Sequence, residues 1–136
     1  MLQPLKQSVF ICATLIVLSV VYVEATVPAT PQDSDVITVK MTKDHLFDPD
    51  KITIKAGQTV EWVNDEVGGL HEVTDDPDAA SDAGDVSMPE GVMPFDSHII
   101  RSGKSYRYQF TVPGVYRYVC PPHESAGMVG VVTVTK

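Results

Sequence analysis

The chain has 136 residues, with 10 Lys and Arg against 18 Asp and Glu, and a formal net charge of −8 at pH 7. This length accommodates one domain with a hydrophobic core and is too short for two domains of ordinary size. Nucleic acid is a poor partner for so acidic a chain, because its phosphates are bound by Lys and Arg.

The amino terminus predicts a signal for export. Residues 8–23, a run of 16, are almost wholly apolar, follow Lys6, and lead into Val23-Glu24-Ala25, which fits a small-x-small cleavage site. Such a run falls a little short of the roughly 20 apolar residues that span a bilayer. We therefore interpret residues 1–25 as a signal peptide, with an uncleaved anchor as the alternative.

Two further segments complete the predicted domain organisation. Residues 26–34, which contain TVPATPQDS, are rich in Pro and Thr and predict a flexible leader. Residues 35–136 then form the single folded domain. We expect the mature protein in the periplasm or another extracytoplasmic compartment, without a membrane span and as a monomer.

The use of cysteine points to a metal. The chain has 2 Cys, and cleavage after Ala25 removes Cys12 and leaves Cys120 alone. A lone thiol cannot form an internal disulfide, and exported proteins normally pair their cysteines or lack them. We expect a metal to occupy Cys120.

Short alternating runs of β-branched and aromatic residues, separated by Gly, Pro and Asp, predict strands after the leader. No sustained helical period interrupts them. The candidate strands are residues 36–41, 51–55, 59–64, 70–74, 104–112, 114–120 and 128–135. They predict an all-β fold, a two-sheet antiparallel sandwich with Greek-key connections.

The alternation also predicts which side chains face the core, because alternate residues of a strand share one face. The residues expected to point inward are Ile52, Ile54, Val60, Trp62, Tyr106, Tyr108, Phe110 and Val112.

A long loop is predicted for residues 75–94, which are rich in Asp, Gly, Ala, Ser and Pro. It belongs to a wider segment, residues 56–100, with 11 Asp or Glu and no Lys or Arg. This segment is either a solvated surface or an acidic docking patch. Met88 and Met93 are expected to cover the edge of the core rather than to bind metal.

Residues 120–128 read C-P-P-H-E-S-A-G-M and place three candidate metal ligands on one loop between two predicted strands. They are the thiol of Cys120, the imidazole of His123 and the thioether of Met128. Together these donors favour copper, since zinc rarely takes methionine. Two histidines and a cysteine in a plane, with a weak axial methionine, form the electron-transfer geometry of blue copper.

This geometry requires a second histidine from elsewhere in the chain, and the residues alone leave three candidates, His45, His71 and His98. His71 follows a turn-like stretch and opens a predicted strand, so it can lie at one end of the sandwich. For His45 and His98 we expect the usual role of a lone histidine, at the surface or as a hydrogen-bonded part of the core.

The chain also resembles a known family. Residues 47–64 read F-D-P-D-K-I-T-I-K-A-G-Q-T-V-E-W-V-N, which resembles the cupredoxin pattern F-x-P-x-x-I-x-I-x-x-G-x-x-V-x-W-x-N that precedes the first histidine ligand. Residues 116–135 resemble the closing strands and ligand loop of plastocyanins and pseudoazurins. Together the two stretches span most of the predicted domain.

This resemblance implies a cupredoxin-like sandwich holding one type 1 copper. By position, His71 takes the role of the first histidine, Cys120 that of the thiolate, His123 that of the second histidine and Met128 that of the axial ligand. It also implies one-electron transport without catalysis. A copper-trafficking or storage protein is the main alternative, and a multicopper enzyme would need more histidines than the 4 in the chain.

The expected partners are other redox proteins. Seven acids lie between His71 and Gly91, in or beside the predicted loop: Glu72, Asp75, Asp76, Asp78, Asp82, Asp85 and Glu90. A negative field near the copper would attract a partner with a basic docking surface, and the complex would be small and short-lived.

Overall fold

The computed structural model describes residues 36–136. The predicted signal peptide, residues 1–25, and the leader, residues 26–34, lie outside the described residues. Within the described part, no helix has the length and apolar character needed to cross a bilayer.

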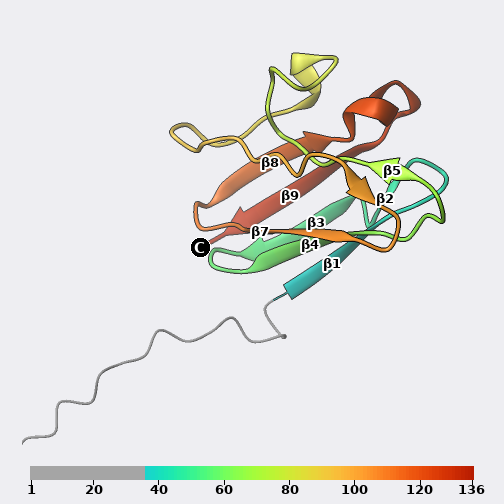
Figure 1. Ribbon diagram of the computed structural model, residues 1–136. Helices are drawn as coiled ribbons and strands as arrows, with labels where there is room; N and C mark the ends of the chain where they lie inside the picture. Colours follow the sequence, from blue (N-terminus) through green and yellow to red (C-terminus); the bar gives the residue numbers. More distant parts are fainter. Residues whose placement is uncertain (1–35) are drawn as a thin grey trace, which may run out of the picture.

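The described chain folds as a β-sandwich (Figure 1). Its strands are β1 Val36–Met41, β2 Phe47–Asp48, β3 Lys51–Lys55, β4 Thr59–Asn64, β5 Leu70–His71, β6 Ile100–Arg101, β7 Ser105–Gln109, β8 Gly114–Val119 and β9 Val129–Thr135. Residues 36–136 also contain two short 3-10 helices, η2 Ala83–Asp85 and η3 Pro121–Ala126.

One sheet has the strand order β2-β1-β4-β7 and the other the order β3-β9-β8, while β5 and β6 form a separate pair. The prediction of a sandwich is confirmed, but the prediction that its sheets are antiparallel is wrong in part. β1 pairs with β4, and β3 with β9, in parallel. After β1 and β2 the chain crosses to the other sheet as β3 and returns as β4, so β4 runs in the same direction as its neighbour β1.

Three predicted strands, β1, β3 and β4, have the predicted bounds, and the others are shorter. The stretch 70–74 keeps only β5 and an isolated bridge at Thr74, which pairs with both Asp96 and Val119. The two-residue strands β2 and β6 and the helix η3 were not predicted. Each is too short for a period to appear in the sequence. β2 is defined by its pairing with the nearby strand β1, and β6 by its pairing with β5, about 30 residues earlier in the chain.

Trp62 lies at the centre of the core between the sheets. It is fully buried, and its ring contacts those of Phe95, Tyr106, Phe110 and Tyr118 at centroid distances of 5.3–6.2 Å. The alternation of apolar residues in the sequence therefore predicted correctly that Trp62 and the aromatic residues of 106–110 face the core.

Two expectations about apolar side chains are wrong. Val112 is 40% exposed, because β7 ends at Gln109 and the alternation of buried and exposed side chains does not continue beyond Phe110. Met88 packs against the core as expected, whereas Met93 is 80% exposed.

The long loop of residues 75–94 lies above β8 in Figure 1, coloured yellow-green to yellow. Ser87 forms a bridge with Arg117 of β8, and Asp85 forms an ion pair with Arg117 at 3.2 Å. The expectation that all seven acids contribute to a surface is wrong for Asp75, which is fully buried. Its Oδ1 accepts a hydrogen bond from the backbone N–H of Phe95 at 2.8 Å.

Candidate metal centre

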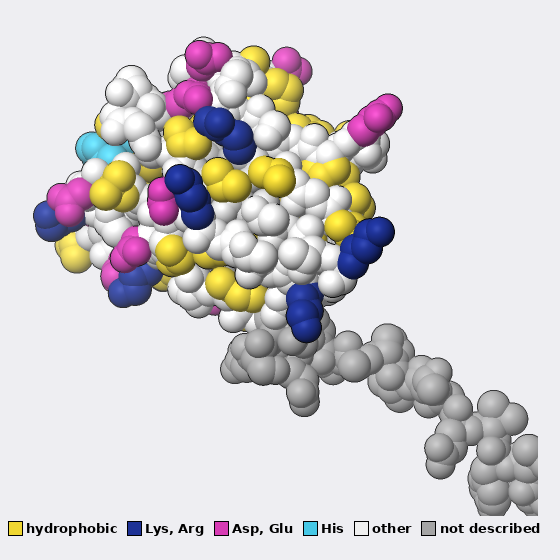
Figure 2. All heavy atoms as spheres, turned by 180° about the vertical axis from the view of Figure 1, so that it is seen from behind, with side chains coloured by type: hydrophobic (Ala, Val, Ile, Leu, Met, Phe, Trp, Pro, Cys, Tyr) yellow, Lys and Arg dark blue, Asp and Glu magenta, His cyan; other side chains and the backbone are white. Residues whose placement is uncertain are grey.

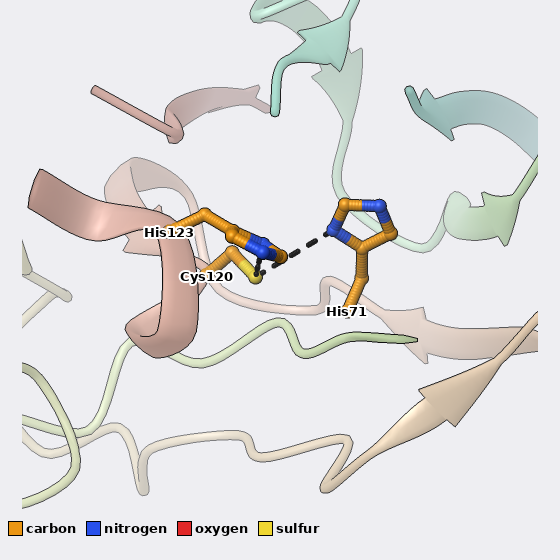
Figure 3. A group of neighbouring side chains, drawn as sticks. All are labelled: His71, Cys120 and His123. Atoms are coloured by element: carbon orange, nitrogen blue, oxygen red, sulfur yellow. Dashed lines mark hydrogen bonds between the residues drawn. The ribbon is translucent and has the colours of Figure 1, made fainter. Parts of the chain in front are cut away.

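Three of the predicted ligands converge at one end of the sandwich (Figure 3). His71 ends β5, Cys120 directly follows β8, and His123 lies in η3. One donor atom from each of the three side chains lies within 4.8 Å of the others. The Sγ of Cys120 is 3.4 Å from Nδ1 of His123 and 3.8 Å from Nδ1 of His71.

The ligand loop, residues 120–128, is closed by hydrogen bonds within itself. The backbone N–H of His123 donates to the carbonyl of Cys120 at 2.8 Å, and the N–H of Cys120 donates to the carbonyl of Met128 at 3.1 Å. Gly127 ends η3 with φ 87°, a left-handed conformation in which glycine carries no Cβ penalty. Met128, the fourth predicted ligand, is fully buried and directly precedes β9.

Glu124 attaches the ligand loop to the rest of the molecule. It is 7% exposed, and its two carboxylate oxygens accept the backbone N–H groups of Ser81 and Asp82 at 2.7 and 2.8 Å. A buried carboxylate is stable only when hydrogen bonds replace its hydration. The long acidic loop therefore holds the helical turn that carries His123.

The His71 loop, residues 64–71, depends on side-chain hydrogen bonds. Buried Asn64 donates through Nδ2 to the carbonyls of Gly69 and Ile100, and its Oδ1 accepts the N–H of Glu66. Glu66 in turn reaches His71, with Oε2 and Nε2 3.0 Å apart. Pairing of His71 with Ile100 across β5 and β6 completes the support.

The sulfur of Cys120 is buried and accepts a hydrogen bond from the backbone N–H of Glu72 at 3.3 Å. Burial, the largest cause, raises the pKa of the Cys120 thiol to about 11. Without metal the thiol is therefore protonated at neutral pH, and a bound cation must displace that proton.

The two imidazoles differ in their surroundings. Burial lowers the pKa of both His71 and His123, which favours the neutral form that binds metals. His71 is 1% exposed, whereas His123 is only partly buried. The ring of His45 stacks on that of His123 with centroids 3.9 Å apart and planes 9° apart.

The donor set fits copper better than other common metals. Two imidazole nitrogens and a thiolate suit copper and zinc alike, whereas a thioether ligand favours copper. Met128, whose backbone carbonyl accepts the N–H of Cys120, is the residue that can supply it. No carboxylate belongs to the donor cluster found among residues 36–136, although zinc and the hard cations commonly use one.

The remaining histidines have different positions. His98 is at the surface, with its side chain 87% exposed and Nδ1 3.3 Å from Asp96, as expected for a lone histidine. His45 contacts the site, which the sequence did not reveal. Sequence reasoning also assigned no role to Asn64, Glu66 and Glu124. Asn64 is the last fixed residue of the pattern over residues 47–64, but the pattern does not reveal its hydrogen bonds, and no motif distinguishes Glu66 or Glu124 from neighbouring polar residues.

Comparison with known proteins agrees with this geometry. Residues 34–135 match the family described as copper binding proteins, plastocyanin/azurin family. Plastocyanin of Scenedesmus fuscus is 36% identical over 101 residues, which cover 72% of this chain and 98% of the relative. Chloroplastic plastocyanin of Tetradesmus obliquus is 39% identical over 93 residues, covering 65% of this chain and 58% of the relative.

A solved structure of an amicyanin mutant in the Cu(I) form superposes with a TM-score of 0.58 at 26% identity, covering 77% of this chain and 86% of that one. The resemblance seen in the sequence is therefore confirmed. The chain belongs to the plastocyanin/azurin family of copper-binding proteins, which are electron carriers and not enzymes.

Proposed function

We propose that the protein is a blue-copper electron carrier that cycles between Cu(I) and Cu(II), with its copper held by His71, Cys120, His123 and Met128. The observation that carries this proposal is the convergence of two imidazoles and a thiol within 4.8 Å in a largely buried site. Bound copper supplies the one-electron chemistry.

The chain contributes rigidity and exclusion of water. His71, Cys120 and Met128 are 0–1% exposed, and hydrogen bonds hold both loops in place. Ligands that cannot move or be hydrated require little rearrangement when the metal changes oxidation state. His123, the partly exposed ligand, is the route by which electrons reach a partner.

The same burial argues against copper trafficking. A protein that passes metal to a partner needs ligands that the partner can reach, and here only His123 meets that requirement. Methionines can serve as accessible ligands in such proteins, but of the two methionines in the long loop, Met88 packs against the core and only Met93 is exposed.

Visible absorption tests the proposal. The oxidised, copper-loaded protein is expected to show an intense charge-transfer band from thiolate to copper, and Cys120→Ser to abolish it. Met128→Leu should keep copper and colour and raise the reduction potential, because loss of an axial electron donor disfavours Cu(II). A wild-type protein that takes up one copper and remains colourless contradicts the assignment.

We further propose export, with residues 1–25 as the signal peptide, 26–34 as the leader and 35–136 as the copper domain. The apolar run ahead of Ala25 and the family match over residues 34–135 support this division. Amino-terminal sequencing of the protein isolated from its native cells tests it, and a mature chain that still begins at Met1 contradicts it.

A redox partner with a basic docking surface follows from the charge. The exposed acids of the long loop are Asp78, Asp82 and Glu90. On the face seen in Figure 2, acidic and basic side chains are mixed, so this face is not a uniformly acidic surface. Attraction between unlike charges raises association rates roughly 10 to 1000 fold at low salt and is screened beyond about 8 Å at physiological ionic strength.

The partner proposal is tested with the physiological partner in stopped-flow experiments. Electron transfer should slow as salt increases, and the double substitution Asp78→Asn and Asp82→Asn should flatten that dependence. Asp50→Asn, which removes an exposed acid between β2 and β3, is the control. A rate that does not respond to salt contradicts electrostatic docking.

A further inference from the structure

Glu66 contacts His71, a predicted copper ligand, at the ring nitrogen that points away from Cys120. Its Oε2 lies 3.0 Å from Nε2 of His71, on an imidazole that is fully buried, while the carboxylate side chain is 23% exposed. The other ring nitrogen, Nδ1, faces Cys120 Sγ at 3.8 Å. The two nitrogens of this ring therefore have separate partners.

This division determines where the ring carries its hydrogen. A carboxylate oxygen accepts a hydrogen bond, so the contact with Glu66 places the hydrogen on Nε2. Nδ1 then presents its lone pair to the metal site. A hydrogen bond from a ligand imidazole to a carboxylate also makes the imidazole a stronger electron donor.

The loop is built to bring Glu66 back onto His71. The backbone of Glu66 is fixed by the Oδ1 of Asn64, which accepts its N–H at 3.0 Å. Its side chain then passes over Gly69, so closely that a Cβ at that position would overlap the Glu66 carboxylate. Only glycine leaves room for this contact.

We propose, on the basis of the proposed copper function, that Glu66 is a positioning residue for His71. Its carboxylate fixes the Nε2–H tautomer, directs Nδ1 to the copper and lowers the reduction potential. The potential falls because a negative charge next to the ligand, and the stronger donation that it causes, stabilise Cu(II) more than Cu(I).

The first test needs no metal. Two-bond proton–nitrogen NMR correlations of the copper-free protein report the tautomer of each histidine. His71 should carry its hydrogen on Nε2 in the wild type and in Glu66→Gln, whose amide oxygen still accepts, and should lose this preference in Glu66→Ala. A wild-type His71 with its hydrogen on Nδ1, or an unchanged tautomer in Glu66→Ala, overturns the proposal.

The second test is the reduction potential of the copper-loaded variants. Glu66→Gln and Glu66→Ala should both raise it, because both remove the charge, and Glu66→Ala should raise it further. Asp65→Asn is the matched control, since it removes an equal charge from the adjacent residue, whose carboxylate is 59% exposed and pairs with Lys40. A shift in Glu66→Ala no larger than in Asp65→Asn overturns the proposal.

The third test moves the carboxylate without removing it. Gly69→Ala should raise the reduction potential when it is introduced alone. It should have no further effect when Glu66→Ala is already present, because both changes remove the contact between Glu66 and His71. Equal shifts in both backgrounds overturn the proposal. If the proposed copper function itself is wrong, the copper-loaded wild-type protein shows no charge-transfer band. The metal-free NMR test of Glu66 still applies in that case.

Discussion

The ligand loop, residues 120–128, and the His71 loop, residues 64–71, meet at the same site but are supported differently. The ligand loop is closed by its own backbone, through the bonds of Cys120 to His123 and Met128. The His71 loop depends on side chains, and Asn64 connects it to Ile100, 36 residues further along the chain. One half of the site is therefore local in sequence and the other is made by the tertiary fold.

The two halves also differ in exposure. His71 is buried and hydrogen-bonded to Glu66, whereas His123 is partly exposed and stacked on His45. A site with one fixed, enclosed imidazole and one accessible imidazole separates two requirements of a carrier. The enclosed side preserves the geometry, and the accessible side meets the partner.

The largest effect is expected from removing each imidazole in turn. His71→Gly and His123→Gly should both lose the charge-transfer band. Added imidazole should restore it in His123→Gly, because solvent reaches that position, and should fail in His71→Gly, whose ring is 1% exposed. Visible absorption during titration with imidazole measures the recovery of the band, with the wild type as control. Equal recovery in both variants would contradict the difference in solvent access between His71 and His123.

The next effect concerns the stability of the His71 loop. Asn64→Ala removes two donated hydrogen bonds and one accepted bond at a buried position, and should lower the free energy of unfolding by about 3 kcal/mol. Urea unfolding of the copper-free protein measures it. Gln109→Ala, which removes an exposed side chain bonded to Gly57, should cost at most about 0.5 kcal/mol. Equal costs would contradict the dependence of the His71 loop on Asn64.

The free energy of unfolding is expected to change with pH by about 3 kcal/mol because of Asp75. This residue lies next to Thr74, which pairs with Val119 beside the ligand loop. Burial, the largest cause, raises the pKa of Asp75 from 3.8 to about 6. The folded state therefore binds this proton more tightly than the unfolded state. The resulting stabilisation is fully present below about pH 4 and is lost as the pH rises to about 6.

Asp75→Asn should remove this contribution, so the difference in unfolding free energy between wild type and variant should change between pH 4 and 6. Chemical unfolding of the copper-free proteins at several pH values measures it. Asp78→Asn, at an exposed position of the same loop, should leave the profile unchanged. A constant difference between wild type and Asp75→Asn would show that Asp75 titrates alike in the folded and unfolded states.

The smallest effect is expected from the stack on His123. His45→Ala should lower the free energy of unfolding by about 1 kcal/mol, the usual contribution of an aromatic pair, whereas His45→Phe should retain most of it. Thermal unfolding of the copper-free variants provides the measurement. Identical melting temperatures for Ala and Phe at this position would mean that the stack does not stabilise the ligand loop.

Much of the fold could be predicted because strands leave a period of two in the sequence. β1, β3 and β4 have the predicted bounds, and Trp62 and Phe110 are buried as expected. β5 and β6 are only two residues long, so no period marks them, and their positions follow from pairing with each other. The directions of β1 and β4 could not be predicted either, because they depend on which sheet the chain enters between them.

The sequence by itself determined the ligand loop, where a thiol, an imidazole and a thioether within nine residues indicate copper, because a short segment keeps its donors close in any fold. Only the tertiary structure decided what surrounds them. The pairing of β5 with β6 and the bonds of Asn64 bring His71 to Cys120, and the same loop brings Glu66 to the back of the ring. The burial of Asp75 among equally acidic neighbours was also decided there. Charge and spacing are properties of the chain, whereas the partner of each side chain depends on residues far away in sequence.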